Sequence, residues 1–336
     1  MRYQQQFTSG HAQRHTNHSV PPEPHAIVIR SFIAKIPPTA QGIALMFVST
    51  LCFTAMQTGV RIVAADSENP LPPLELAFLR NAFGVVALLP IFARSGLVII
   101  KTRRIKMHFF RAAVQAAGMM CFFTGLVLIP FAEVTALSFS APLFATVLAI
   151  MLMGERVRLR RISALLVGFA GVLIVLRPGV DAMSLGALLI LGSSFLWAVA
   201  MTMIKSLSRT ESSVTTTLYA GLFMAPITLV PALFVWVQPN LEQLVWMLGV
   251  GTLGTLGHVA FAQAFKLAEM SAVLPLDFLR LLWASAVGLW LFSETPSLVA
   301  WLGGLVIFSS ASYIAFREAQ LGRQASIARR QAKSQS

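Results

Sequence analysis

The chain carries a series of long apolar blocks, each about the length of a membrane-spanning helix. Prolines, glycines and charged clusters separate these blocks from Gln41 to Phe316. A helix rises 1.5 Å per residue, so roughly 20 apolar residues cross a hydrocarbon core about 30 Å thick. We therefore predict ten transmembrane helices, at residues 41–63, 74–93, 108–129, 132–153, 161–177, 184–206, 214–237, 242–265, 269–292 and 297–316.

The composition excludes a water-soluble globular domain. Hydrophobic residues make up 56% of the chain and charged residues only 12%, whereas soluble domains are about 45–50% apolar and about 25% charged. The predicted fold class is therefore an all-α membrane protein embedded in a lipid bilayer.

The net charge of +13 follows from membrane topology. If the N-terminus is cytoplasmic, most of the 26 Lys and Arg residues fall in cytoplasmic loops and tails, as the positive-inside rule requires. We expect an inner-membrane protein with both termini cytoplasmic and no affinity for nucleic acid. The opposite side receives mainly acidic residues and one loop cation, namely Asp66, Glu68, Asp181, Glu242, Glu294 and Arg177.

Neither the two tails nor the two cysteines show the pattern of a cofactor or structural metal site. Residues 1–39 are rich in Gln, His, Ser, Thr and Pro, which is typical of a disordered cytoplasmic tail. Residues 318–336 form a second, basic cytoplasmic tail. Cys52 and Cys121 lie inside apolar blocks, in no metal-ligand spacing. We therefore expect no cofactor and no metal, although four tail histidines could bind a metal loosely, namely His11, His15, His18 and His25.

Landmarks recur in the same order in the two halves of the membrane region. Residues 42–50 align with residues 186–194, and this register places Arg61 opposite Lys205. A late proline, an Ala-Glu pair and a final glutamate also recur. Each half holds five helices, an odd number, so the second half enters the bilayer from the opposite side. We predict two inverted five-helix repeats, residues 40–180 and 181–317, an architecture of alternating-access transporters.

Several segments resemble the ten-helix drug/metabolite transporter superfamily of the EamA type, over essentially all of residues 41–316. Ser293 departs from the pattern, because a glycine there would match Gly154, and we expect a looser turn. The resemblance implies transport of small metabolites without ATP hydrolysis. The segments that carry it are residues 75–81, 132–144, 154–155, 168–179, 275–280 and 292–294.

Arg80 is the first candidate for substrate contact. It lies about 9 Å inside its predicted span, where an ionisable group costs roughly 2.5–3.5 kcal/mol. We expect it to face a cavity or a substrate anion. The alternative is a structural ion pair with Glu75 or Glu133.

Asp277, Arg280 and His258 form a second group of candidates. The spacing of three places Asp277 and Arg280 on one helix face, where they form either a static pair or a pair that a substrate or proton opens. His258 lies at a similar depth on the neighbouring span, which allows a proton relay with Asp277 or a simple contact between helices.

The remaining candidates are polar or helix-breaking. Gln57, Asn81, Gln115 and Ser138 lie at mid-depth, where most such groups only join helices. Pro142 and Pro275 interrupt one span in each half, and paired interrupted helices indicate a transporter's central site. The GxGxxG match at residues 249–254 lies inside an apolar span with no preceding strand, so we interpret it as a helix-packing surface.

The predicted function is that of a secondary active transporter, which moves a small amino-acid, nucleotide, vitamin or drug-like metabolite by alternating access. Coupling to a proton or to exchange stays open. An intramembrane enzyme is the alternative, but Asp277 has no aspartate partner at its depth, so we expect no catalytic residues. A non-transporting membrane scaffold is a second alternative. The small residues of the last span, such as Gly303, predict contact either with the fifth span or with a second protomer in a homodimer.

Overall fold

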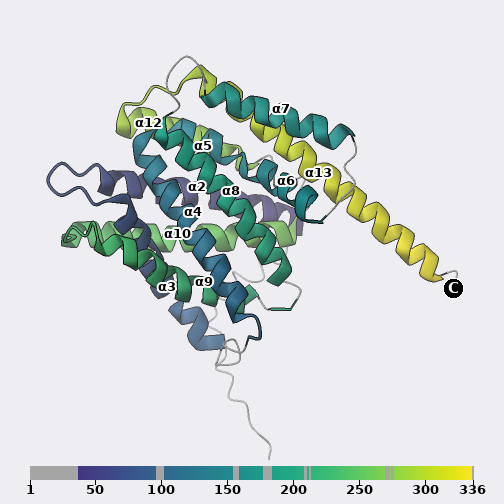
Figure 1. The fold of residues 1–336 in the computed structure, drawn as a ribbon, viewed down its shortest axis with the longest axis horizontal. Helices are drawn as coiled ribbons and strands as arrows, with labels where there is room; N and C mark the ends of the chain where they lie inside the picture. The colour runs from purple at the N-terminus through teal and green to yellow at the C-terminus, as the bar shows by residue number, and fades with distance from the viewer. Residues whose placement is uncertain are drawn as a thin grey trace, which may run out of the picture. The chain divides into compact units, whose positions relative to one another are not determined.

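The computed structural model describes residues 37–95, 102–153, 159–176, 184–207, 210–211, 213–268, 273 and 276–334. Regular secondary structure in these ranges is entirely helical, and Figure 1 shows its helices. The predicted N-terminal tail, apart from its last three residues, lies outside them. The helices are α2 (Pro38–Ala64), α3 (Pro73–Ser95), α4 (Ile105–Leu128), α5 (Phe131–Ser138), α6 (Ala141–Met153), α7 (Leu159–Leu176), α8 (Leu185–Leu207), α9 (Ser213–Leu233), α10 (Leu241–Leu267), α12 (Leu279–Phe292) and α13 (Leu298–Ser334).

Each of the ten predicted spans overlaps a described helix or helix pair, which confirms the all-helical, ten-helix expectation. Six stretches, in α2, α4, α5–α6, α8, α10 and α13, are long and apolar enough to cross a membrane, and three shorter apolar helices accompany them. The chain is therefore a multi-pass membrane protein. Two spans differ from the prediction in detail. The fourth is divided into α5 and α6, and only the second half of the ninth, α12, is a described helix.

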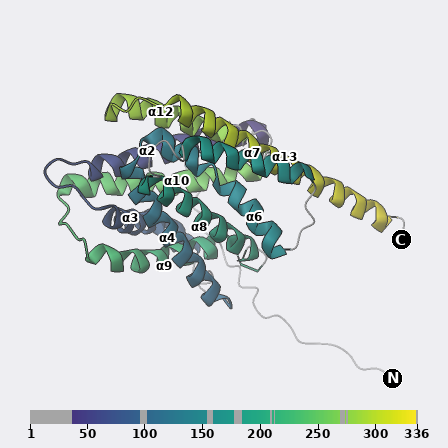
Figure 2. The same ribbon diagram turned by 45° about the horizontal axis from the view of Figure 1, so that its top comes forward.

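Helices distant in the sequence form the main contacts. The α2 helix packs along α10, α4 along α8, and α7 along α13, and α3 contacts both α9 and α10. Figures 1 and 2 show α7 and α13 side by side. The core between the helices consists of large apolar side chains, such as Leu76, Phe123, Phe131 and Leu137, all almost completely buried.

Glycines bring α13 close to α7. A Cβ atom at Gly303 would overlap Cγ2 of Val175, and one at Gly171 would lie 2.9 Å from the backbone nitrogen of Ile307. The hydroxyl of Ser310 donates a hydrogen bond to the carbonyl of Ala164 across the same contact. Of the two contacts predicted for this small-residue face, the structure therefore contains the one with the fifth span.

Three of the four α10 glycines, Gly251, Gly254 and Gly257, pack in the same way, whereas Gly249 has no neighbour within 4 Å. A Cβ atom at Gly251 would lie 2.7 Å from Cβ of Phe83, and one at Gly257 would lie 3.1 Å from the ring of Phe53. The GxGxxG sequence thus lies in a helix–helix contact, as predicted, because small residues allow helix backbones to approach closely.

Three threonines on α2 bond to their own helix. The hydroxyl of Thr50 donates to the carbonyl of Phe47 (2.7 Å), that of Thr54 to Thr50 (3.0 Å) and that of Thr58 to Thr54 (2.8 Å). This threonine ladder satisfies three polar groups inside an apolar helix, so none of the three hydroxyls needs a neighbouring helix as its acceptor.

A capping box fixes the start of α10. The Asn240 side chain accepts from the backbone N–H of Gln243 (2.8 Å), and the Gln243 side chain accepts from that of Asn240 (3.0 Å). Gln243 also donates to Asp66 (3.0 Å), in the loop after α2. The backbone N–H groups of Glu68 and Asn69 bond to Asp66 and lower the pKa of its carboxyl group. The α2–α3 loop is thereby attached to the start of α10.

Candidate functional site

His258 lies at a junction of three helices. Its ring, on α10, contacts the Phe53 ring of α2 edge-on, with centroids 4.9 Å apart, and stacks near Trp197 of α8 at 6.0 Å. A Cβ atom at Gly254, one turn earlier on α10, would lie 3.0 Å from Nη2 of Arg80 on α3, and the guanidinium of Arg280 on α12 lies 6.0 Å from the same Phe53 ring. Basic groups from α3, α10 and α12 therefore lie near one group of aromatic rings.

The guanidinium of Arg80 has few polar partners among the described residues. Its Nη1 donates to Oδ1 of Asn81 (3.1 Å), and the Asn81 amide in turn donates to Thr228 (3.3 Å). Its Nε is buried and has no partner among the described residues. Glu75 accepts instead from the backbone N–H of Val237 (2.9 Å). The structure therefore holds no pair between Arg80 and Glu75, one of the two structural alternatives.

Asp277 and Arg280 form a direct ion pair. Nη2 of Arg280 lies 2.6 Å from Oδ2 of Asp277, with 22% and 14% of the two side chains exposed. The Arg280 guanidinium also lies over the ring of Phe139, at 5.4 Å, and near Phe53, at 6.0 Å. Oδ1 of Asp277 has no hydrogen-bond partner in the described part of the chain. The described polar contact of Asp277 is thus with Arg280, and a relay with His258 stays a prediction.

Gln115 leads to a basic residue that the sequence analysis missed. Nη2 of Arg111, one turn earlier on α4, donates to Oε1 of Gln115 (3.0 Å), and its Nη1 donates to the carbonyl of Thr216 (2.8 Å). Arg111 is buried. Depth alone did not single it out, because Arg111 lies only three residues, about 4.5 Å, inside the predicted span at 108–129.

The other candidates lie apart from these contacts. The hydroxyl of Ser138 donates to the carbonyl of Val134 within α5 (2.7 Å), so it satisfies its own helix. Gln57 on α2 is partly buried and has no hydrogen bond among the described residues. Pro142 lies in the first turn of α6, directly after the break that follows Ser138. Pro275 lies outside the described residues.

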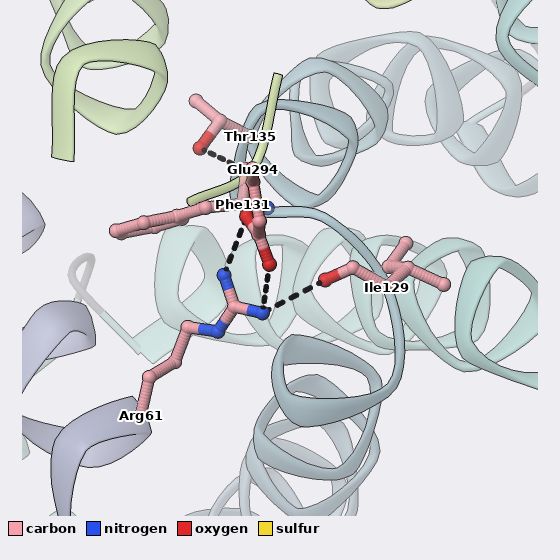
Figure 3. A network of polar contacts seen from close by, with 5 residues as sticks. All are labelled: Arg61, Ile129, Phe131, Thr135 and Glu294. Atoms are coloured by element: carbon pink, nitrogen blue, oxygen red, sulfur yellow. Dashed lines mark hydrogen bonds and ion pairs between the residues drawn. The ribbon is translucent and has the colours of Figure 1, made fainter. Parts of the chain in front are cut away.

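A second ionic contact, between Arg61 and Glu294, lies at the end of the bundle predicted to face outward (Figure 3). Nη1 and Nη2 of Arg61 reach the two carboxylate oxygens of Glu294 at 2.9 and 2.5 Å. The same carboxylate accepts from the backbone N–H of Phe131, the first residue of α5, at 2.8 Å. The guanidinium also lies 4.6 Å from the ring centre of Phe292. This contact joins α2 and α5 to the segment between α12 and α13.

A serine in the left-handed conformation forms the turn that places Glu294. Ser293 adopts the left-handed conformation (φ 53°), which favours glycine. The N–H of Glu294 then bonds to the carbonyl of Gly288, six residues earlier (2.9 Å), which closes the end of α12. The serine therefore takes the backbone conformation of a glycine, and the looser turn stays a prediction, because Gly154, the residue of comparison, lies outside the described residues.

The described interior therefore presents basic and aromatic groups rather than the ligands of a metal. No group of three His, Cys, Asp or Glu residues within the described ranges is placed to hold a metal ion. Guanidinium groups bind carboxylates and phosphates through paired hydrogen bonds, and aromatic rings offer faces for organic groups.

Comparison with known proteins gives consistent matches. The model of the EamA-like transporter family matches twice, at residues 40–177 and 184–316. A riboflavin transporter of Vibrio cholerae is 31% identical over 84% of this chain and 96% of its own length. An S-adenosylmethionine uptake transporter of Rickettsia bellii is 27% identical over 74% of this chain and 85% of its own. A pseudopaline exporter of Pseudomonas aeruginosa is 26% identical over 79% and 93%.

One solved crystal structure has the same fold. Its chain is 18% identical to this one, and the two superpose with a TM-score of 0.56 over 84% of this chain and 98% of the other. At this level of identity the likeness concerns the fold alone.

Proposed function

Because the chain belongs to the EamA-like transporter family, we propose that it is a secondary active transporter that moves a small organic metabolite across the inner membrane. The relatives named above are transporters of riboflavin, S-adenosylmethionine and pseudopaline, which are all small organic molecules. Transport proceeds by alternating access to a central site.

The observation that carries this proposal is the double match of the family model to the two halves of the chain. Helix contacts support it. In inverted repeats, α2, α3 and α4 correspond to α8, α9 and α10. The contact of α2 with α10 then corresponds to that of α8 with α4. The contact of α3 with α10 likewise corresponds to that of α9 with α4. Both members of each pair occur. We infer that residues 40–180 and 181–317 are inverted five-helix repeats.

The central site draws side chains from both halves. Arg80 and Phe53 come from the first half, and His258 and Arg280 from the second. A rocking motion of one half against the other changes the contacts of such a site. A cargo that binds one arrangement more tightly shifts the population toward it.

The Arg61–Glu294 contact is suited to closing one end of this path. It joins α2 in the first half to the α12–α13 segment in the second half. An opening of the bundle at this end separates the two side chains. Coupling to a proton, coupling to exchange and homodimer formation are further parts of the hypothesis, and the experiments below do not depend on them.

A labelling experiment tests the inverted topology without knowledge of the cargo. Glu68 follows α2 and Thr210 follows α8, both are exposed, and the repeat places them on opposite sides of the membrane. In a chain whose Cys52 and Cys121 are replaced by serine, we expect Glu68→Cys, and not Thr210→Cys, to react with a membrane-impermeant maleimide on intact cells. Reaction of both would refute the inverted repeat.

Counterflow in proteoliposomes tests transport itself. Labelled riboflavin and S-adenosylmethionine are the first probes, followed by a panel of small metabolites. We expect at least one labelled compound to enter saturably, and faster when the vesicles contain the same compound unlabelled. Flux that rises linearly with concentration would indicate a channel, and the absence of flux across the panel would favour a scaffold.

A further inference from the structure

Arg80 differs from the two ion-paired arginines. Arg61 has the carboxylate of Glu294, and Arg280 has that of Asp277. The described hydrogen bond of Arg80 goes to the neutral amide of Asn81, and its Nε has no partner among the described residues. A guanidinium inside a membrane costs several kcal/mol unless it is paired or faces water or a ligand. The charge of Arg80 therefore has no counter-ion among the described residues.

Gly254 allows α10 to approach the unused donors of Arg80 closely. A Cβ atom at this position of α10 would lie 3.0 Å from Nη2 of Arg80, 3.2 Å from its Nε and 2.8 Å from Sδ of Met56. Gly254 also lies four residues before His258, and residues four apart share one face of a helix. The Nε–Nη2 edge of Arg80 and the ring of His258 thus border the same face of α10.

The surrounding charge favours an anion. Arg80 lies against α10 one turn before His258, and Arg280 lies near the Phe53 ring that His258 contacts. Of the two, only Arg280 has a carboxylate partner in the described part of the chain. The charge of Arg80 is therefore left without a carboxylate among these residues. Such a site attracts a negatively charged molecule and repels a cation.

Resting on the proposed transport function, we propose that the cargo is an organic anion whose carboxylate or phosphate binds the Nε and Nη2 groups of Arg80. This edge of a guanidinium offers two parallel N–H donors, which match the two oxygens of an oxyanion. The adjoining rings of His258, Phe53 and Trp197 contact the organic part of the cargo.

Thermal unfolding of the purified full-length chain in detergent tests the proposal with matched probes. The pairs are nicotinate with nicotinamide, and riboflavin 5′-phosphate with riboflavin, which differ mainly in charge. Choline, a permanent cation without a carboxylate or phosphate, serves as the cationic probe. We expect at least one anion to raise the unfolding temperature more than its neutral partner at equal concentration, and the pair that responds distinguishes a carboxylate from a phosphate.

Variants assign the effect to Arg80. We expect Arg80→Gln to weaken binding of the anion by about tenfold or more, because a hydrogen bond to a charged group is lost. Arg80→Lys keeps the charge without the paired donors and should retain part of the affinity. Gly254→Ala keeps Arg80 but places a methyl group 3.0 Å from its Nη2 and 3.2 Å from its Nε, so it should also weaken binding. Arg103→Gln, at an exposed arginine, makes the same charge change and should leave binding unchanged.

Three results would overturn the proposal. They are an equal response to neutral or cationic probes, anion binding that survives in Arg80→Gln, and the lack of a shift with every anion. Counterflow separates this proposal from the transport function. Saturable counterflow of a neutral compound that persists in Arg80→Gln would keep the transporter and reject the anion site. Anion binding that requires Arg80, without counterflow of that anion, would keep the anion site and reject the transport of that anion.

Discussion

Glu294→Gln should destabilise the folded chain substantially. The substitution keeps the shape of the side chain and its ability to accept from the N–H of Phe131, but it removes the charge opposite Arg61. The Arg61 side chain is only 10% exposed. It would therefore be left as a largely buried cation without its counter-ion.

The magnitude follows from the burial of the pair. Removing one partner of a fully buried ion pair costs about 3–5 kcal/mol, whereas exposed pairs contribute about 0–1 kcal/mol. Exposures of 10% for Arg61 and 21% for Glu294 place this pair nearer the buried limit. The nearby ring of Phe292 retains part of the interaction with the cation. We expect a loss of about 2–3 kcal/mol in the free energy of unfolding.

A double-mutant cycle, measured by unfolding in a denaturing detergent, isolates the pair. Arg61→Gln combined with Glu294→Gln removes both charges, so it should cost less than the sum of the two single substitutions. Glu68→Gln is the control, because this carboxylate of the predicted outer side is exposed. A loss below about 0.5 kcal/mol for Glu294→Gln, or single effects that simply add, would refute the reasoning.

Two further predictions concern packing and pH. Gly303→Ala should cost about 1–3 kcal/mol through overpacking against α7, whereas Gly249→Ala, with no atom within 4 Å of the new Cβ, should be neutral or stabilising in the same unfolding assay. Equal effects would contradict this packing. Asp66 has a pKa lowered by the N–H groups of Glu68 and Asn69, so it should stabilise the fold fully above its unfolded pKa of about 3.9 and lose this effect as the pH falls further. The stability difference between the wild type and Asp66→Asn should then shrink in acid, and a constant difference would exclude this linkage.

The sequence predicted the helices well because a bilayer imposes a minimum length on each apolar segment. The predicted span at 242–265, for example, corresponds to α10 at Leu241–Leu267. The break between α5 and α6 was indicated by Pro142, which has no N–H and is tolerated in the first turn of a helix. The length of an apolar segment and the positions of helix-breaking residues are local properties, so they can be found in a single sequence.

The contacts of the site were only partly predictable. Sequence position fixes the depth of a residue, and the i,i+3 spacing correctly suggested the pair of Asp277 and Arg280. Depth does not fix which helices are neighbours. For this reason Arg61 was treated as a repeat landmark and Glu294 as a loop charge, although 233 positions separate the two bonded residues. The close approach of Gly254 to Arg80 also could not be predicted without the three-dimensional arrangement of α3 and α10.

The threonine ladder of α2 bears on how this helix can move. The hydroxyls of Thr54 and Thr58 donate to carbonyls of α2 itself, so these bonds travel with the helix. When α2 slides or turns against α10, these two donors keep their acceptors, whereas the hydroxyl of Ser49, which donates to the carbonyl of Gly257 on α10 (3.0 Å), has to exchange its partner. The resistance of α2 to displacement is therefore concentrated at two points, the Ser49–Gly257 hydrogen bond and the Arg61–Glu294 contact at its end.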